Sequence, residues 1–315
     1  MKFGMEQMDE MTENLLEEKM SYLNSVIVGD NSSGKSLLLK KFIEEVRKSN
    51  RVYFIDAVNR NFDVKKISKL ENKPEYKSTI IETRMREEYF NLKDSFNCFG
   101  TSTERVEMIY RLYEDEVQKL FHKLTTDRFD LIEGDVLGEV DFGNGKGLLS
   151  SGYQALIRIL LELLYYKDVV IEKEKVENAW IVIDELDEFL SPKYSARIME
   201  FLKAEFPWAK WVVTTHSCDL VANTFNSNLV ILDNGLYEIL DINDYASVSE
   251  VQLVFDRLFE KENLPENEIE NTLRRLFNNK INNVWGTNEE TSLEKIQKEQ
   301  LSASQKLILR QIQKW

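Results

Sequence analysis

Residues 29–36 read G-D-N-S-S-G-K-S and match the phosphate-binding pattern GxxxxGK[ST] in full. An apolar run, residues 25–28, comes directly before this segment, and Leu38, Phe42 and Val46 follow it at helical spacing. The sequence therefore predicts a strand, a loop and a helix in succession. Backbone N–H groups of such a loop wrap phosphates, and glycine is required where a Cβ would clash. This feature predicts a nucleoside triphosphate site on an α/β scaffold.

The individual residues of this loop have distinct predicted roles. Lys35 is expected to reach the β and γ phosphates, and Ser36 to offer its hydroxyl to Mg²⁺. Both lie in the first turn of the predicted helix, where the helix dipole favours anions. The predicted nucleotide contacts are Gly29, Asp30, Asn31, Ser32, Ser33, Gly34, Lys35, Ser36 and Leu37.

Composition restricts the class of protein. The chain has 315 residues, enough for one large core or a core with a smaller lobe. No stretch approaches the roughly 18 to 20 apolar residues of a membrane span, and the acidic N-terminus does not resemble a secretory signal. Two cysteines make no disulfide framework, so we expect a cytoplasmic protein without membrane association. The net charge of −14 repels nucleic acid, so DNA or RNA binding would need a local basic surface.

The order of patterns along the chain predicts a parallel-rich sheet. A second buried strand at residues 52–56 follows the predicted helix, which is the start of a βαβ unit. Strand-like sequence resumes at residue 131 and includes a hairpin pattern over residues 229–240. We therefore predict a P-loop NTPase core from residues 1–62 and 130–245, a mostly helical insertion at 63–129 and a helical C-terminal region at 246–315.

A second motif supports the nucleotide site. Residues 179–185, A-W-I-V-I-D-E, form an apolar run that ends in two carboxylates, the Walker B arrangement. Asp184 is expected to hold Mg²⁺, and Glu185 to polarise the water that attacks the γ phosphate. An acidic pair alone is weak evidence, but its place downstream of the phosphate-binding loop makes the prediction strong.

Residues 149–154, L-S-S-G-Y-Q, resemble the LSGGQ signature of ABC-type ATPases, and they precede Walker B as in that family. The resemblance implies that Ser150, Ser151 and Gly152 contact ATP bound to the opposite subunit of a head-to-tail homodimer. It also implies that His216, in V-V-T-T-H-S, is the switch histidine that contacts the γ phosphate. The implied cofactors are ATP and Mg²⁺, and the implied reaction is ATP hydrolysis.

The segment after Walker B, D-E-L-D-E-F-L-S-P, places Ser191 where transporters and SMC proteins carry an aspartate, and so resembles the OLD-like and RecF-like soluble branch. The resemblance covers residues 25–56 and 131–240 and has no glutamine at the Q-loop, where Asn59 and Asn61 are the candidates. It implies a regulatory switch for an effector protein, such as a nuclease, in prokaryotic anti-phage defence or toxin–antitoxin systems. The alternatives are a RecF-like DNA-binding repair or replication ATPase and, less favoured, a transporter subunit.

Overall fold

The computed structural model of the chain describes residues 5–16, 20–46, 51–68, 85–86, 90, 96, 105–132, 136–233, 236–245 and 247–258. In the C-terminal part it describes residues 272–273, 276, 280, 285–298, 301, 309 and 312–313. The chain divides into two compact units, Met1–Phe259 and Glu260–Trp315. The first unit contains the elements that carry the predicted site.

A six-stranded sheet forms the centre of the first unit, in the order β2-β6-β7-β1-β8-β9. All neighbouring pairs are parallel except β8 and β9, which form the hairpin expected from the sequence. The turn residues Asn234 and Gly235 lie outside the described residues. This arrangement confirms the predicted α/β class. The strands are β1 (Ser25–Gly29), β2 (Val52–Ile55), β6 (Ala179–Ile183), β7 (Ala209–Thr214), β8 (Asn228–Asp233) and β9 (Leu236–Asp241).

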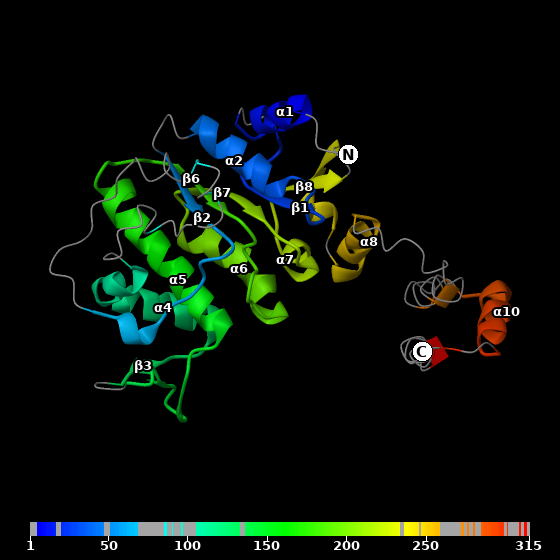
Figure 1. Ribbon diagram of the computed structural model, residues 1–315. Helices are drawn as coiled ribbons and strands as arrows, with labels where there is room; N and C mark the ends of the chain where they lie inside the picture. The colour runs from blue at the N-terminus through cyan, green and yellow to red at the C-terminus, as the bar shows by residue number, and fades with distance from the viewer. Residues whose placement is uncertain are drawn as a thin grey trace. The chain divides into compact units, whose positions relative to one another are not determined.

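Helices cover both faces of the sheet (Figure 1). On one face, α1 (Met5–Leu16) and α2 (Lys35–Val46) pack against strand residues such as Ile27, Val182 and Val212. The neighbouring strand residues, which point the other way, join a larger core with α5 (Ser151–Tyr166), α6 (Pro192–Glu205) and α7 (Cys218–Ala222). Burial on both faces explains why these strands read as continuous apolar runs.

The predicted insertion is described only in part. Its described elements are η2 (Val64–Lys66), η4 (Val106–Leu112) and α4 (Glu114–Thr125), and α4 and η4 pack against α5. The prediction for most of residues 69–104 falls outside the described residues. A small antiparallel sheet follows, formed by β3 (Asp130–Leu131), β4 (Val140–Asp141) and β5 (Lys146–Gly147), and it leads into the signature segment.

The predicted C-terminal helical region at 246–315 begins with a helix that packs on the first unit. This helix, α8 (Val248–Leu258), contacts α7 and buries Val251 and Phe255 in the main core. The first unit therefore extends to Phe259. In the second unit, α10 (Thr287–Ile296) contributes to a small apolar cluster with Leu273, Leu276 and Ile312. The remaining elements are a π-helical segment, η5 (Lys167–Glu172), and a short turn, η6 (Ile242–Asp244).

Within the described residues, no helix combines the length and the apolar character that crossing a membrane would require.

Candidate functional site

The phosphate-binding loop connects the buried end of β1 to the first turn of α2. Lys35 is 7% exposed, and its Nζ donates hydrogen bonds to the carbonyl oxygens of Gly29 at 2.8 Å and Asp30 at 3.1 Å. Burial lowers the pKa of Lys35, while the charges of Asp184, Glu185 and Asp30 act in the opposite direction. A partly desolvated cation is thus held at the start of α2, beside the backbone that the motif assigns to phosphate binding.

The shape of the loop depends on two glycines for different reasons. Gly34 has φ of 103°, a conformation that side chains rarely adopt, and its carbonyl oxygen accepts from Leu38 N at 2.8 Å. A Cβ at Gly29 would lie 2.7 Å from the carbonyl oxygen of Leu232 on β8. The sequence predicted that both glycines admit phosphates, whereas at Gly29 the structure shows crowding by a neighbouring strand.

The other predicted loop residues surround this backbone. Ser32 adopts a left-handed conformation with φ of 67°, and Ser33 N donates to the carbonyl oxygen of Asp30 at 3.1 Å. Asp30, Asn31 and Ser32 are exposed, and so is Leu37, at 46%. The open side of the loop therefore presents polar groups and main chain to an incoming ligand.

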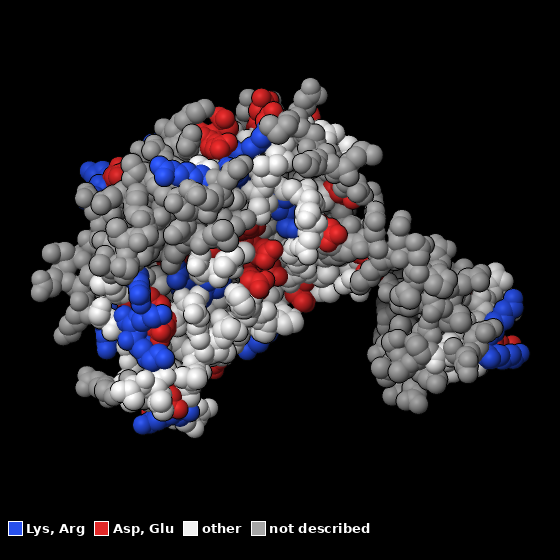
Figure 2. All heavy atoms as spheres, viewed as in Figure 1, with Lys and Arg blue, Asp and Glu red and all other residues white. Residues whose placement is uncertain are grey.

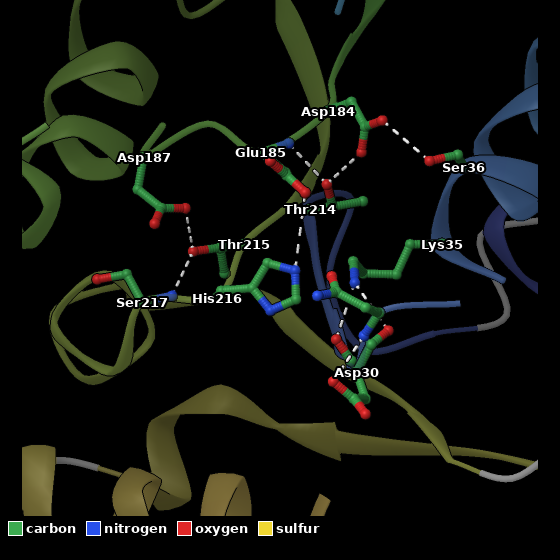
Figure 3. A network of polar contacts seen from close by, with 12 residues as sticks. Asp30, Lys35, Ser36, Asp184, Glu185, Asp187, Thr214, Thr215, His216 and Ser217 are labelled. Atoms are coloured by element: carbon green, nitrogen blue, oxygen red, sulfur yellow. Dashed lines mark hydrogen bonds and ion pairs between the residues drawn. The ribbon is translucent and has the colours of Figure 1, made fainter. Parts of the chain in front are cut away.

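Asp184 of Walker B lies next to the end of the phosphate-binding loop and is 4% exposed (Figure 3). Ser36 Oγ donates to Asp184 Oδ2 at 3.1 Å, and Thr214 Oγ1 donates to Asp184 Oδ1 at 2.6 Å. Hard oxygen donors of this kind suit Mg²⁺. Within the described residues no cluster of three or more His, Cys, Asp or Glu side chains could hold a metal, so Mg²⁺ here would take further ligands from phosphates and water.

Thr214 is a site residue that the sequence analysis missed. It ends β7, which lies between the Walker A strand β1 and the Walker B strand β6. Its Oγ1 also accepts from Glu185 N at 2.7 Å, so one hydroxyl contacts both Walker B residues. The only sequence signal was that Thr214 ends an apolar run, as Asp184 follows one.

Glu185 lies beside His216 in the same part of the site (Figure 3). The distance from His216 Nε2 to Glu185 Oε1 is 3.7 Å. Burial raises the pKa of Glu185, and the Asp184 charge raises it further. Burial lowers the pKa of His216, and Lys35 lowers it further. A carboxylate of increased basicity next to a neutral imidazole suits proton acceptance from water.

The residues that flank His216 are fixed by hydrogen bonds. Thr215 Oγ1 donates to Asp187 Oδ1, and the same hydroxyl accepts from Ser217 N at 2.9 Å. Ser217 also caps α7 by accepting from Leu220 N at 3.2 Å. These contacts fix the main chain on both sides of His216 and limit where its ring can lie.

The signature segment belongs to a different part of the unit. Ser150 is the N-cap of α5 and accepts from Tyr153 N at 3.2 Å, while Ser150 and Ser151 are exposed. Gly152 is buried, and a Cβ there would lie 2.9 Å from the carbonyl oxygen of Phe189. In the part of the chain that the structure describes, no hydrogen bond joins these three residues to the phosphate-binding loop.

The Q-loop candidates make hydrogen bonds with other residues of the same chain, Asn59 from a half-buried position and Asn61 from an exposed one. Asn59 N and Nδ2 both donate to Asp56 Oδ1, at 2.8 and 3.0 Å. The carbonyl oxygen of Asn61 accepts from Arg158 Nη1 at 3.1 Å. After Walker B, Ser191 is the N-cap of α6 and Pro192 is its first residue, the start that this dipeptide predicts.

Comparisons with known proteins match parts of this chain. Residues 99–223 match a family described as an AAA domain, putative AbiEii toxin, type IV TA system. The Septu protein PtuA of Bacillus thuringiensis is 28% identical over 158 residues, which cover 48% of this chain and 35% of that protein. The chain thus matches about a third of the length of that relative.

Solved structures give looser matches. CbiO1 of Clostridium perfringens, part of an ABC transporter complex, is 15% identical with a TM-score of 0.38, over 75% of this chain and 84% of that one. The SMC head domain from Thermotoga maritima is 19% identical with a TM-score of 0.31, over 43% and 49%. The family match spans the segment that carries Asp184, Glu185 and His216, and β1 delivers a complete phosphate-binding loop to the same sheet edge. The family match over residues 99–223, together with the complete phosphate-binding loop, indicates a P-loop ATPase of the AAA/ABC type.

Proposed function

We propose that this ATPase hydrolyses MgATP and uses an ATP-dependent head-to-tail homodimer as a switch for an effector protein. The observation that carries hydrolysis is the position of Glu185, a partly desolvated carboxylate beside the Ser36–Asp184 pair. The direct test is phosphate release from MgATP by the purified protein. A protein that binds ATP without releasing phosphate would rule out the enzymatic part of the proposal.

The proposed chemistry is in-line displacement at the γ phosphorus. The oxygen of water forms the new bond to phosphorus, the bond to the β–γ bridging oxygen breaks, and Glu185 accepts the water proton. Lys35 offsets the negative charge that develops on the phosphate oxygens, and neutral His216 contacts the γ phosphate. Ser36 and Asp184 would hold Mg²⁺, which supplies further charge neutralisation when bound.

The dimer part of the proposal rests on the position of the signature. Ser150 begins a 16-residue helix and is exposed, and the described contacts do not join it to the loop of its own chain. A helix N-terminus with exposed serines suits an anion, so we assign Ser150, Ser151 and Gly152 to the phosphates bound by a second copy. Each ATP would then be enclosed by the loop of one subunit and the signature of the other.

The pH dependence of kcat/KM tests the assigned base. The raised pKa of Glu185 means that kcat/KM should fall as the pH drops through a value above the ordinary 4.5 of a glutamate. His216 has a lowered pKa and stays neutral above the ordinary 6.5, so it should add no titration near neutral pH. Steady-state rates measured across pH on protein verified as folded would show this. A profile flat down to the ordinary glutamate value would contradict the assignment.

The dimer assignment can be tested with two variants of one residue. Ser150→Arg should leave nucleotide binding by the monomer intact and abolish ATP-dependent dimerisation, because it places bulk and misplaced charge at the interface. Ser150→Arg also removes the N-cap of α5, which lowers the stability of the fold by about 1 kcal/mol. A second variant is therefore needed to separate this effect from the effect on the interface. Ser150→Asp retains an N-cap side chain but repels phosphate, and should also prevent dimerisation without destabilising α5.

A mixture then distinguishes an interface defect from a folding defect. When the Ser150→Arg and Lys35→Ala proteins are mixed, a mixed dimer contains one complete composite site. That site consists of the intact phosphate-binding loop of the Ser150→Arg subunit and the intact signature of the Lys35→Ala subunit. Association of this mixture with ATP, measured by light scattering, is expected even though neither variant dimerises alone. Normal dimerisation of Ser150→Arg by itself, or no association of two folded variants, would contradict the head-to-tail arrangement.

The proposed partner is an effector protein of a prokaryotic anti-phage defence or toxin–antitoxin system. Support comes from the family that residues 99–223 match, whose description names a putative toxin, and from the OLD-like segment after Walker B. Copurification from the native cell followed by mass spectrometry would identify the effector. DNA binding has less support, because the net charge of −14 repels nucleic acid; on the face in Figure 2, acidic side chains gather near the centre and basic ones at the lower left.

A further inference from the structure

Arg60 is a buried cation that contacts the main chain of the Walker B motif. It follows β2 in sequence, is 2% exposed and is among the largest fully buried side chains of the chain. Its Nη2 donates to the carbonyl oxygen of Asp184 at 2.8 Å and, at the longer distance of 3.5 Å, to that of Glu185. Arg60 therefore contacts the main chain of both carboxylate residues from the interior of the protein.

The contacts of Arg60 complete a clamp on one peptide unit. The carbonyl oxygen of Asp184 and the N–H of Glu185 belong to the same peptide group. Arg60 Nη2 binds the oxygen, and Thr214 Oγ1 accepts from the nitrogen at 2.7 Å. Because φ of Glu185 is the rotation about the bond that leads out of this peptide plane, the two side chains together restrict φ at that residue by holding the plane.

The clamp acts where the backbone is strained. Glu185 has φ of 51°, in the left-handed region that residues other than glycine rarely occupy. Such a conformation persists only where the surroundings hold it, and it is common at active sites. Main-chain hydrogen bonds at 3.0 Å, from Asp184 N to Ile55 O and from Leu186 N to Thr214 O, hold the residues on either side, and the clamp holds the peptide between them.

Stability alone does not account for Arg60. Within the described residues, its Nε and Nη1 have no hydrogen-bond partner although both atoms are buried. Burial lowers the pKa of its guanidinium, while the negative charges of Asp56 and Glu162 act in the opposite direction. Buried donors without partners destabilise a fold, so the contacts that Arg60 makes with the Walker B main chain have to offset that cost.

The segment that carries Arg60 is also tied to the signature helix α5. Arg158 of this helix donates to the carbonyl oxygen of Asn61 at 3.1 Å and is paired with Glu162 at 2.9 Å. Phe62 N donates to Gln154 Oε1 at 3.4 Å, and Gln154 Nε2 donates to the carbonyl oxygen of Leu149 at 2.9 Å. Residues 60–62 thus connect the Walker B peptide to the start of α5.

We propose that Arg60 is a positioning residue that holds the Asp184–Glu185 peptide in its strained conformation. Arg60 thereby links the orientation of the Glu185 carboxylate to the signature helix α5. The proposal rests on the proposed function, because it assigns Arg60 an effect that acts through Glu185. Arg60 does not touch the phosphate-binding loop in any described contact. Nucleotide binding and the chemical step should therefore respond differently when it is replaced.

The test is a double-mutant cycle between Arg60→Met and Glu185→Gln. Arg60→Met should lower kcat about 10- to 100-fold and change the affinity for ATP less than about threefold. In the Glu185→Gln background the same change should have no further effect on single-turnover hydrolysis, because the base is already absent. Arg111→Met, on an exposed arginine paired with Glu114, is the control and should change none of these quantities.

The conservative variant Arg60→Lys provides a second measurement. It keeps one charged donor and should recover part of the lost kcat; this also serves if Arg60→Met folds poorly. Equal rate losses from Arg60→Met in both backgrounds, or a loss of ATP affinity as large as the loss of kcat, would overturn the proposal. If Glu185→Gln alone hydrolyses ATP at the normal rate, the proposed base is wrong, and that failure is recognised before Arg60 is varied.

Discussion

Lys35→Ala should abolish nucleotide binding while the fold is retained. Lys35 Nζ is held by two loop carbonyl oxygens and is the cation that the phosphate-binding loop places at the start of α2. Truncating one partner of a desolvated charge contact typically costs about 2 to 5 kcal/mol, so we expect affinity for ATP to fall by about 30-fold to a few thousand-fold. Calorimetric titration with ATP and ADP in the presence of Mg²⁺ measures this directly.

The control for Lys35→Ala is Lys40→Ala, which removes the same side chain from the same helix, one turn further from the loop. It should bind nucleotide like the unmodified protein. Because Lys35 is buried and burial lowers its pKa, its removal should not lower the unfolding temperature of the nucleotide-free protein. Unchanged ATP affinity in folded Lys35→Ala would refute the assignment of this loop.

Glu185→Gln should bind MgATP normally and hydrolyse it about 10²- to 10⁴-fold more slowly. The carboxamide has nearly the same shape and keeps its main-chain contacts with Thr214, but it cannot accept the proton of the attacking water. The expected consequence is accumulation of an ATP-bound dimer, observed by size-exclusion chromatography with light scattering. Phosphate release measured under single-turnover conditions gives the rate of the chemical step.

Glu188→Gln is the matched control for that variant. It makes the same substitution three residues later, on a carboxylate whose charge contributes to the raised pKa of Glu185 but which makes no described contact with Asp184, Ser36 or His216. We expect less than about a threefold change in rate. Near-normal turnover by Glu185→Gln would instead assign the base to another group.

Local chemistry explains why much of the site was predictable. The spacing of Gly34, Lys35 and Ser36 encodes the loop, because the backbone there needs φ of 103° at a glycine immediately before a helix. Apolar runs that end in polar residues encoded β1, β6 and β7, since strands of a parallel sheet are buried on both faces. The sequence was less informative about α8, because an amphipathic helix does not indicate which surface covers it.

The remaining features depend on which strands become neighbours. Insertion of β7 between β1 and β6 brings Thr214 to both Walker B residues, and this pairing joins segments about thirty residues apart. The same packing buries Arg60 against the carbonyl oxygen of Asp184. The sequence around residue 60 contains no charge pattern that would predict this position. The sequence by itself determined the phosphate-binding loop and the carboxylates, because their backbone and side-chain requirements are local. Only the tertiary structure decided what holds those carboxylates in place, because hydrogen bonds between distant segments form once the sheet order is set.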